Sequence, residues 1–309
     1  MTWLDNQIKD LEETNSKFKE EISKIKKINP KTLNEFLEAT PLKLVFLDYS
    51  LKIYVSIIHN HIKNSNFFDK MFYIDLFCGS GLDRLKSKND LLIGSPFIAI
   101  LNHRLKFNSF FFCDNNKDYY TTLKSRIEVL GIPNTDISKE DCNLEIDKII
   151  ETIKKSKKSH SFFFIDPYST EFNWASMNKV LKIYGDVLFT FMTPAINRIR
   201  DSAFAQSNNK TEVLDKFFGD KSWNNPAKDV VEIYKENILK IREKGLIESV
   251  RIADYYDLIF ITNKTKKENR WMRGIIKAKK EIESNSKQAV KIALDKCKRG
   301  QKDLSTFWS

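Results

Sequence analysis

The chain has 309 residues, a hydrophobic fraction of 41% and a formal net charge of +11. A hydrophobic fraction of this size supports a folded core and excludes a chain that is disordered throughout. The four cysteines lack Cys-x-x-Cys spacing, which argues against a zinc site or a disulfide framework and favours a reduced, cytoplasmic protein. The N-terminus is charged and no apolar run approaches ~18 residues, so we expect neither a signal peptide nor a membrane span.

Residues 1–70 predict a helical extension. Residues 1–27 carry apolar side chains at roughly helical spacing among many Lys and Glu, which predicts one exposed amphipathic helix that could act as a docking arm. Residues 32–66 predict two more helices, the second beginning at Pro41.

From residue 71 onward, short apolar strands alternate with helices. Seven strands are expected, at residues 71–77, 109–113, 135–137, 161–165, 186–192, 247–252 and 257–262. The first five are continuously apolar and separated by helical segments, which is typical of a parallel sheet buried on both faces. The last two lie too close together for a crossover helix and must pair antiparallel. The sequence therefore predicts an α/β fold with a seven-stranded, mostly parallel sheet and an antiparallel last strand.

The same pattern suggests three parts. Residues 71–263 form the α/β domain, with a helical insertion at about 195–245, and residues 264–309 form a basic helical segment. Fourteen Lys and Arg lie between Lys264 and Lys302, far more than the Asp and Glu there. Such a block attracts polyanions, nucleic acid first among them, although a solvated basic helix would have the same composition.

A turn with two glycines ends the first strand, in the sequence Asp75-Leu76-Phe77-Cys78-Gly79-Ser80-Gly81. Glycine permits a sharp turn and a close approach to the backbone, and ligands of open α/β sheets bind at the carboxyl ends of the strands. We therefore expect a nucleotide-type cofactor here. A dinucleotide or phosphate is less favoured, because position 84 is Arg where the third glycine of a dinucleotide motif would stand.

Acidic residues follow the second and third strands. A carboxylate at Asp114 could accept hydrogen bonds from both ribose hydroxyls of a cofactor, or it could cap the following helix. Asp141 occupies the equivalent position after the third strand and could bind an adenine amino group. Asp136 and Glu140 are alternatives for that contact.

The fourth strand ends in Asp166-Pro167-Tyr168-Ser169. This turn is similar to the Asp/Asn-Pro-Pro-aromatic turn of methyltransferases that act on exocyclic amino groups, although one proline is missing. The similarity implies that Asp166 and the Pro167 carbonyl hold the amino group. It also implies that Tyr168 stacks on a base that has left its helix or is single-stranded. The alternative is an ordinary turn with Tyr168 packed nearby.

Basic residues outside these motifs are candidate contacts to nucleic acid. Arg side chains bind phosphate and carboxylate well, but a salt-bridged surface helix would look the same. The candidates are Asn197, Arg198, Arg200, Lys266, Lys267, Arg270 and Arg273. The four histidines show no ligand spacing, so no metal is expected.

Four segments together resemble the three-Cys-motif partner family. They are residues 73–81 (YIDLFCGSG), 94–99 (GSPFIA), 162–169 (FFFIDPYS) and 256–263 (YDLIFITN). The resemblance implies a Rossmann-like class I methyltransferase fold and S-adenosylmethionine bound by Asp75, Phe77, Gly79, Ser80, Gly81, Asp114 and Asp141. Asp75 would hold the methionine ammonium group. A separate radical-SAM-like protein that carries the three cysteines would be the partner.

Three hypotheses about function follow. The first is an S-adenosylmethionine-dependent methyltransferase that acts on nucleic acid, at a base amino group, with Asp166, Pro167 and Tyr168 at the reacting centre. The second is a non-catalytic protein of the same fold that binds nucleic acid through residues 264–302 and presents it to the three-Cys partner. The third, a small-molecule methyltransferase, leaves the basic block without a role.

Overall fold

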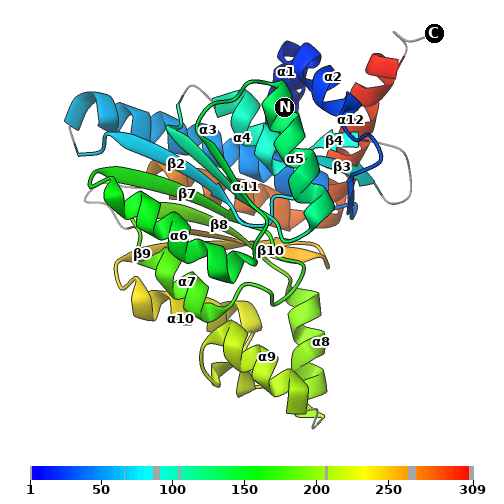
Figure 1. Ribbon diagram of the computed structural model, residues 1–309. Coiled ribbons are helices and arrows are strands. Elements are labelled where there is room, and N and C mark those ends of the chain that lie inside the picture. The colour runs from blue at the N-terminus through cyan, green and yellow to red at the C-terminus, as the bar shows by residue number, and fades with distance from the viewer. Residues whose placement is uncertain are drawn as a thin grey trace.

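The computed structural model describes residues 2–65, 67–85, 91–103, 106–205, 208–263 and 269–305. Its central strands are β2 (Lys70–Asp75), β5 (Ser109–Cys113), β6 (Thr135–Ser138), β7 (Ser159–Ile165), β8 (Gly185–Phe191), β9 (Gly245–Ile252) and β10 (Tyr256–Asn263). They form one sheet in the order β6-β5-β2-β7-β8-β10-β9 (Figure 1). β10 is antiparallel to both its neighbours and all other pairs are parallel. The predicted seven-stranded sheet is confirmed.

Both faces of this sheet are buried, which explains its apolar strands. Every residue of β7 is buried, and its side chains alternate between the two faces. Phe162 and Phe164 pack on one side, and Phe163 and Ile165 on the other. One face is covered by α3 (Thr40–Ser65), α4 (Ser95–His103), α5 (Lys117–Val129) and α11 (Arg270–Ser284). The other is covered by α6 (Cys142–Lys155), α7 (Trp174–Leu181), α9 (Asn208–Phe218) and α10 (Val230–Ile241).

The N-terminal segment is not an exposed arm, so that prediction is wrong. It forms two helices, α1 (Trp3–Lys17) and α2 (Lys19–Lys27). Their apolar residues, among them Leu4, Ile8 and Ile25, are buried in the same core as α3. The segment is helical, as its spacing predicts, but its apolar stripe is buried against this protein's own α3, α11 and α12 (Ser286–Ser305).

Residues 32–66 also differ from the prediction of two helices. They form one three-residue strand, β1 (Asn34–Phe36), and the single helix α3. β1 pairs with β3 (Leu82–Leu85), which pairs with β4 (Leu91–Ile93), in a small second sheet. A strand of three residues is too short to show periodicity, so the sequence gives no signal for it. This small sheet brings Asn34 next to the glycine turn.

The remaining helices follow the predicted order. Residues 193–241 are mostly helical and contain α8 (Thr193–Phe204), α9, the short helix η1 (Ser222–Asn224) and α10. In α11, Trp271, Ile275 and Ile282 are buried, and the helix packs against α3 and β9. Of the helices in the described ranges, none has the length and apolar character needed to cross a membrane.

Candidate active site

The glycine turn lies directly after β2, as expected. Gly79 has φ +59° and Gly81 has φ +81°, conformations that favour glycine. A Cβ atom at Gly79 would lie 2.2 Å from Asn34 Nδ2, and one at Gly81 would lie 2.4 Å from a ring carbon of Phe97. Both glycines are therefore required by contacts within the chain. Their presence alone does not imply a ligand at the backbone.

Asn34 connects the turn to a buried carboxylate, a role for which the sequence shows no pattern. Its Oδ1 accepts a hydrogen bond from the Ser80 N–H (2.9 Å), and its Nδ2 donates to Asp83 Oδ1 (2.7 Å). Asp83 is buried, which raises its pKa to about 6, and the charge of Asp166 acts in the same direction. The turn is thus held from the side by β1.

Arg126 stabilises the glycine turn through hydrogen bonds to Ser80. Its fully buried guanidinium donates to the Ser80 carbonyl (2.8 Å) and to the Ser80 hydroxyl (3.1 Å). It also donates to the carbonyl oxygens of Ile28, Asn29 and Thr32. One side chain of α5 therefore joins the glycine turn to the segment between α2 and β1.

Asp75 carries a buried carboxylate oxygen that has no hydrogen-bond partner among the described residues. The residue is fully buried, and its Oδ2 accepts a hydrogen bond from the Tyr73 hydroxyl (3.3 Å). The oxygen that lacks such a partner is Oδ1. Burial raises the pKa of Asp75 to about 7, and the charge of Asp166 acts in the same direction, while the Ser95 hydroxyl, the Tyr73 hydroxyl and the Phe77 N–H oppose the shift. A buried polar atom without a partner is costly, and a ligand that donates a hydrogen bond would satisfy it.

Asp114 and Asp141 differ in how much of their hydrogen-bonding capacity is used. Asp114 accepts from the Gly79 N–H at Oδ2 (2.8 Å) and from the Asn116 N–H at Oδ1 (2.9 Å), and burial raises its pKa. A carboxylate has about four lone-pair sites, so two remain. Asp141 is exposed and caps α6, with Oδ1 accepting from the Asn143 N–H (2.7 Å).

Asp166 follows β7 and makes an ion pair that the sequence did not reveal. Lys43 Nζ, from the first turn of α3, lies 2.5 Å from Asp166 Oδ2. The same ammonium lies 5.6 Å from the centre of the Tyr256 ring. The side chain of Lys43 is only 12% exposed. An ammonium group therefore rests on the carboxylate that was predicted to hold a substrate amine.

The rest of the Asp-Pro-Tyr turn is divided between core and surface. Pro167 is buried, whereas 72% of Tyr168 is exposed. Phe77 is half-buried and packs edge-on against Phe172. Asp75 and Asp166 stand at the ends of the paired strands β2 and β7, and Asn34 joins Asp83 to the glycine turn, so these three carboxyls lie at the same edge of the sheet.

The candidate nucleic-acid residues do not gather at this site as a set. Arg200 donates to the Lys228 carbonyl (2.9 Å) and packs on Phe204, so it holds the helical insertion together. Asn197 is half-buried and Arg198 is exposed on the same helix. Lys266 and Lys267 lie outside the described residues. Arg270 and Arg273 are exposed on α11.

Part of the basic C-terminal block is neutralised by ion pairs. Lys279 pairs with Glu248 (3.2 Å), Lys287 with Asp254 (3.3 Å) and Lys296 with Asp5 (2.5 Å). Within the described ranges, no group of three or more His, Cys, Asp or Glu is placed to hold a metal ion.

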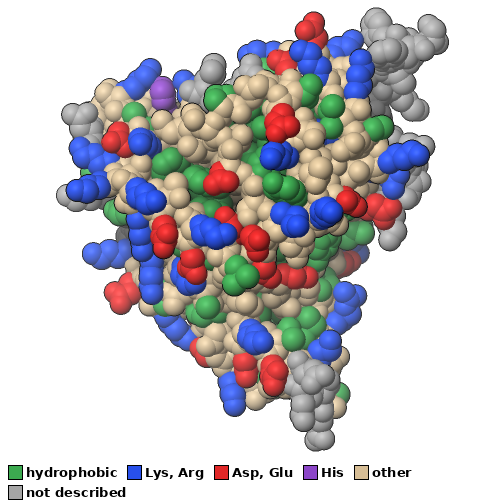
Figure 2. Space-filling view, in the orientation of Figure 1, with side chains coloured by type: hydrophobic (Ala, Val, Ile, Leu, Met, Phe, Trp, Pro, Cys, Tyr) green, Lys and Arg blue, Asp and Glu red, His purple; other side chains and the backbone are tan. Residues whose placement is uncertain are grey.

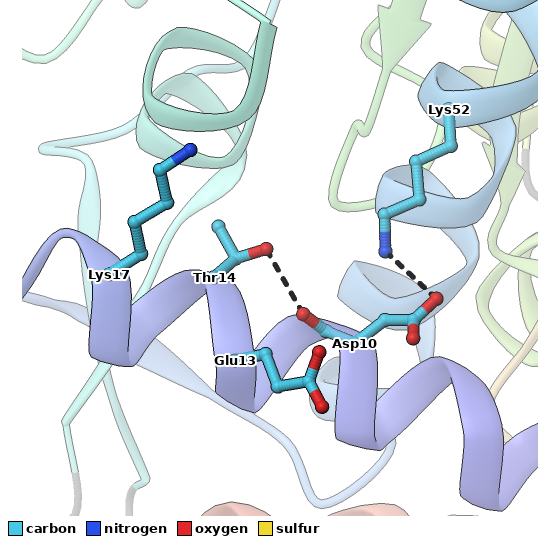
Figure 3. Close-up of a pocket in the computed structure, with 5 residues that line it drawn as sticks. All are labelled: Asp10, Glu13, Thr14, Lys17 and Lys52. Carbon is cyan, nitrogen blue, oxygen red and sulfur yellow. Dashed lines mark hydrogen bonds and ion pairs between the residues drawn. The ribbon is translucent and has the colours of Figure 1, made fainter.

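A shallow groove of about 310 Å³ lies between α1 and α3. It is lined by Asp10, Glu13, Thr14, Lys17 and Lys52 (Figure 3). Lys52 pairs with Asp10 (3.4 Å) and also with Asp48 (2.7 Å). The groove contains none of the predicted site residues.

Comparison with solved structures finds methyltransferases. An rRNA methylase from Streptococcus thermophilus is 8% identical with a TM-score of 0.35, covering 64% of this chain and 89% of that one. A ribosomal protein L11 methylase from Lactobacillus delbrueckii subsp. bulgaricus is 12% identical with a TM-score of 0.30, covering 63% and 71%. The SMU.1697c protein of Streptococcus mutans, solved in complex with SAH, is 13% identical with a TM-score of 0.34, covering 67% and 97%.

Likenesses at these scores carry no argument about activity, and the fold is established here by strand order and direction. No protein-family model matches the chain, and no curated protein matches its sequence.

Proposed function

We propose that this protein is an S-adenosylmethionine-dependent methyltransferase that acts on an amino group in nucleic acid. The observation that carries the proposal is the convergence of Asp75, Asp114 and Asp166 around the glycine turn. All three stand at the carboxyl ends of neighbouring strands, where open α/β sheets bind their ligands.

The carboxylates suit the polar parts of the cofactor. The buried Asp75 Oδ1 lacks a donor, and an ammonium group of the methionine portion would supply one. Asp114 keeps lone pairs for two ribose hydroxyls. Asp141 uses only Oδ1 for its two hydrogen bonds to Asn143, so Oδ2 can accept one from the adenine amino group. When bound, S-adenosylmethionine supplies an electrophilic methyl group.

The acceptor amine would be positioned by the Asp-Pro-Tyr turn. Asp166 and the Pro167 carbonyl accept its two hydrogens and so direct the nitrogen lone pair. Positioning of this kind needs no strong general base, because the methylated nitrogen can release its proton to nearby water. The exposed ring of Tyr168 is available to stack on an unpaired base. Because Lys43 rests on Asp166 Oδ2, the incoming amine must use Oδ1 or displace that ammonium.

Two measurements test the proposal. Calorimetric titration with S-adenosylmethionine should show micromolar binding that Asp75→Ala abolishes. Asp166→Ala should lower methyl transfer to RNA or DNA at least about 100-fold while cofactor affinity stays within a few-fold. Because Asp166→Ala leaves Lys43 without its partner, the double variant Lys43→Met/Asp166→Ala serves as the folding control. Undiminished turnover in Asp166→Ala would remove the proposed role.

A second candidate is a non-catalytic nucleic-acid-binding protein of the same fold. It is favoured by the glycine turn, whose Gly79 and Ser80 N–H groups are bonded within the chain, and by the Lys43–Asp166 pair. Such a protein would present nucleic acid to a radical-SAM-like three-Cys partner in the cytoplasm. Absence of cofactor binding by the folded protein would select this candidate.

A further inference from the structure

We propose that the opposite edge of the sheet, where the parallel strands begin, binds single-stranded nucleic acid. The amino-edge surface is defined by two exposed aromatic residues and five exposed lysines. These residues are Phe67, Tyr184, Lys63, Lys70, Lys157, Lys158 and Lys182.

The two exposed aromatic rings pack on a third, buried ring. Phe67 and Tyr184 are each 57% exposed, and their ring centres lie 6.1 Å apart. Both rings pack against Phe68, at 4.7 and 5.8 Å, and Phe68 is itself buried against His160. The two rings are therefore supported by Phe68, are inclined at 66° to each other, and stay more than half exposed.

The lysines lie near these rings because the starts of β2, β7 and β8 meet at the same edge of the sheet. Lys70 opens β2 and lies opposite Ser159, and the Asp69 N–H donates to the Lys158 carbonyl (2.8 Å). The Ser161 N–H donates to the Tyr184 carbonyl (3.0 Å), which brings the start of β8 alongside. Lys and Arg side chains line much of the left edge in Figure 2, where these strands begin in Figure 1.

The positive charge of this surface is not neutralised locally. Segments 61–70, 154–158 and 182–184 contain seven lysines and a single acidic residue, Asp69. Across the described part of the chain, no carboxylate forms an ion pair with any of the five surface lysines. Lysines at the ends of α3, α6 and α7 also complement the helix dipoles. The helix dipoles do not explain why two aromatic residues that are more than half exposed lie beside these lysines.

The combination of flat rings and unpaired cations selects the ligand. A protein partner would be expected to cover a continuous apolar patch, whereas here only two rings are exposed among lysines. Single-stranded nucleic acid has both complementary features, since its bases stack on aromatic faces and its phosphates bind lysine. The surface lies the length of β7 away from Asp166, seven residues or about 23 Å. It can therefore hold a strand without occupying the candidate active site.

The test is fluorescence anisotropy with the full chain, without cofactor. The probes are a labelled oligouridylate, an oligothymidylate of equal length and a duplex. Phe67→Ala and Tyr184→Ala should each weaken single-strand binding roughly tenfold. Phe67→Leu should behave like Phe67→Ala, and Phe67→Tyr, which keeps the ring, should bind like the parent. Equal affinity for the two single strands would mean that the surface binds RNA and DNA alike. A preference for one of them would identify RNA or DNA as the ligand.

The lysines are tested by a matched pair of double variants. Lys157→Gln/Lys158→Gln should reduce the slope of log K against log salt by about 1.4, since each lost contact to a single strand is worth about 0.7. Lys277→Gln/Lys280→Gln, which removes the same charge from exposed positions on α11, should leave the slope unchanged. The inference is overturned if the ring variants bind like the parent, if the α11 pair has the larger effect, or if the duplex binds more tightly than both single strands. Since no methyl transfer is measured, these results are independent of the proposed reaction.

Discussion

The two edges of the central sheet differ in charge, burial and bonding. At the carboxyl edge, Asp75, Asp83 and Asp166 are largely buried, and one oxygen of each carboxyl accepts a hydrogen bond from within the chain. At the amino edge, lysines and two aromatic rings are exposed and the lysines are unpaired among the described residues. The net charge of +11 therefore averages over an acidic, preorganised site and a basic, open surface. Substitutions at the first edge should affect stability as well as the proposed cofactor binding and methyl transfer, whereas substitutions at the second should weaken nucleic-acid binding with little effect on stability.

The largest effect on stability is expected at Arg126. Replacement by Met leaves five acceptors without their donor, two on the buried Ser80 and one each on the more exposed Ile28, Asn29 and Thr32. We expect Arg126→Met to lower the free energy of unfolding by about 3–5 kcal/mol, measured by urea denaturation. The control is Arg84→Met, which removes a more exposed pair with Glu35 and should cost at most about 1 kcal/mol. Similar losses in the two variants would contradict the role given to Arg126.

Asp75 should make the free energy of unfolding depend on pH. Its pKa is raised from 3.8 to about 7 in the folded state, so the folded protein binds the proton more tightly than the unfolded chain. The stability contributed by the protonated carboxyl is fully present below pH 4 and is lost as the pH rises to about 7. The pKa values of Asp83, Asp186 and Asp257 are also raised, to about 6, so these carboxyls change the stability in the same direction.

The contribution of Asp75 is isolated by comparing the parent with Asp75→Asn. Between pH 5 and pH 8 the parent should lose a few kcal/mol more of unfolding free energy than the variant. An identical pH profile in the two proteins would contradict the raised pKa. Binding of an ammonium ligand favours the ionised carboxylate, so cofactor binding near pH 7 should also release protons, detected by calorimetry in buffers of different ionisation enthalpy.

Gly79 allows the contact with Asn34 to be separated from backbone strain. Gly79→Ala adds both a strained φ and a Cβ 2.2 Å from Asn34, whereas Gly131→Ala has φ +60° with no atom within 4 Å. We expect Gly131→Ala to cost about 1 kcal/mol and Gly79→Ala about 1–2 kcal/mol more. Thermal denaturation of both variants measures the difference. Equal losses would mean that Asn34 moves aside at little cost.

The sequence predicts the sheet better than the site, for a physical reason. Strands such as β7 are buried on both faces, so their apolar runs are visible without knowledge of their neighbours. The partners in the site are distant in the chain, with Lys43 and Asp166 separated by 123 positions and Asn34 and Ser80 by 46. A lysine in a helix or an asparagine in a three-residue strand shows no pattern of its own. The carboxylates at strand ends could be predicted, because the topology alone brings them together.

The smallest effect on stability is expected at the amino edge. Phe67 and Tyr184 are more than half exposed, so replacing either by Ala should change the free energy of unfolding by only about 0.5–1 kcal/mol. The matched comparison is Phe68→Ala, because that ring is 9% exposed and supports both others, and its loss should cost about 3 kcal/mol or more. Thermal denaturation measures all three variants. If Phe67→Ala lowered the free energy of unfolding as much as Phe68→Ala, the Phe67 ring would be part of the core. The amino edge would then not be the open surface that distinguishes it from the buried carboxyl edge.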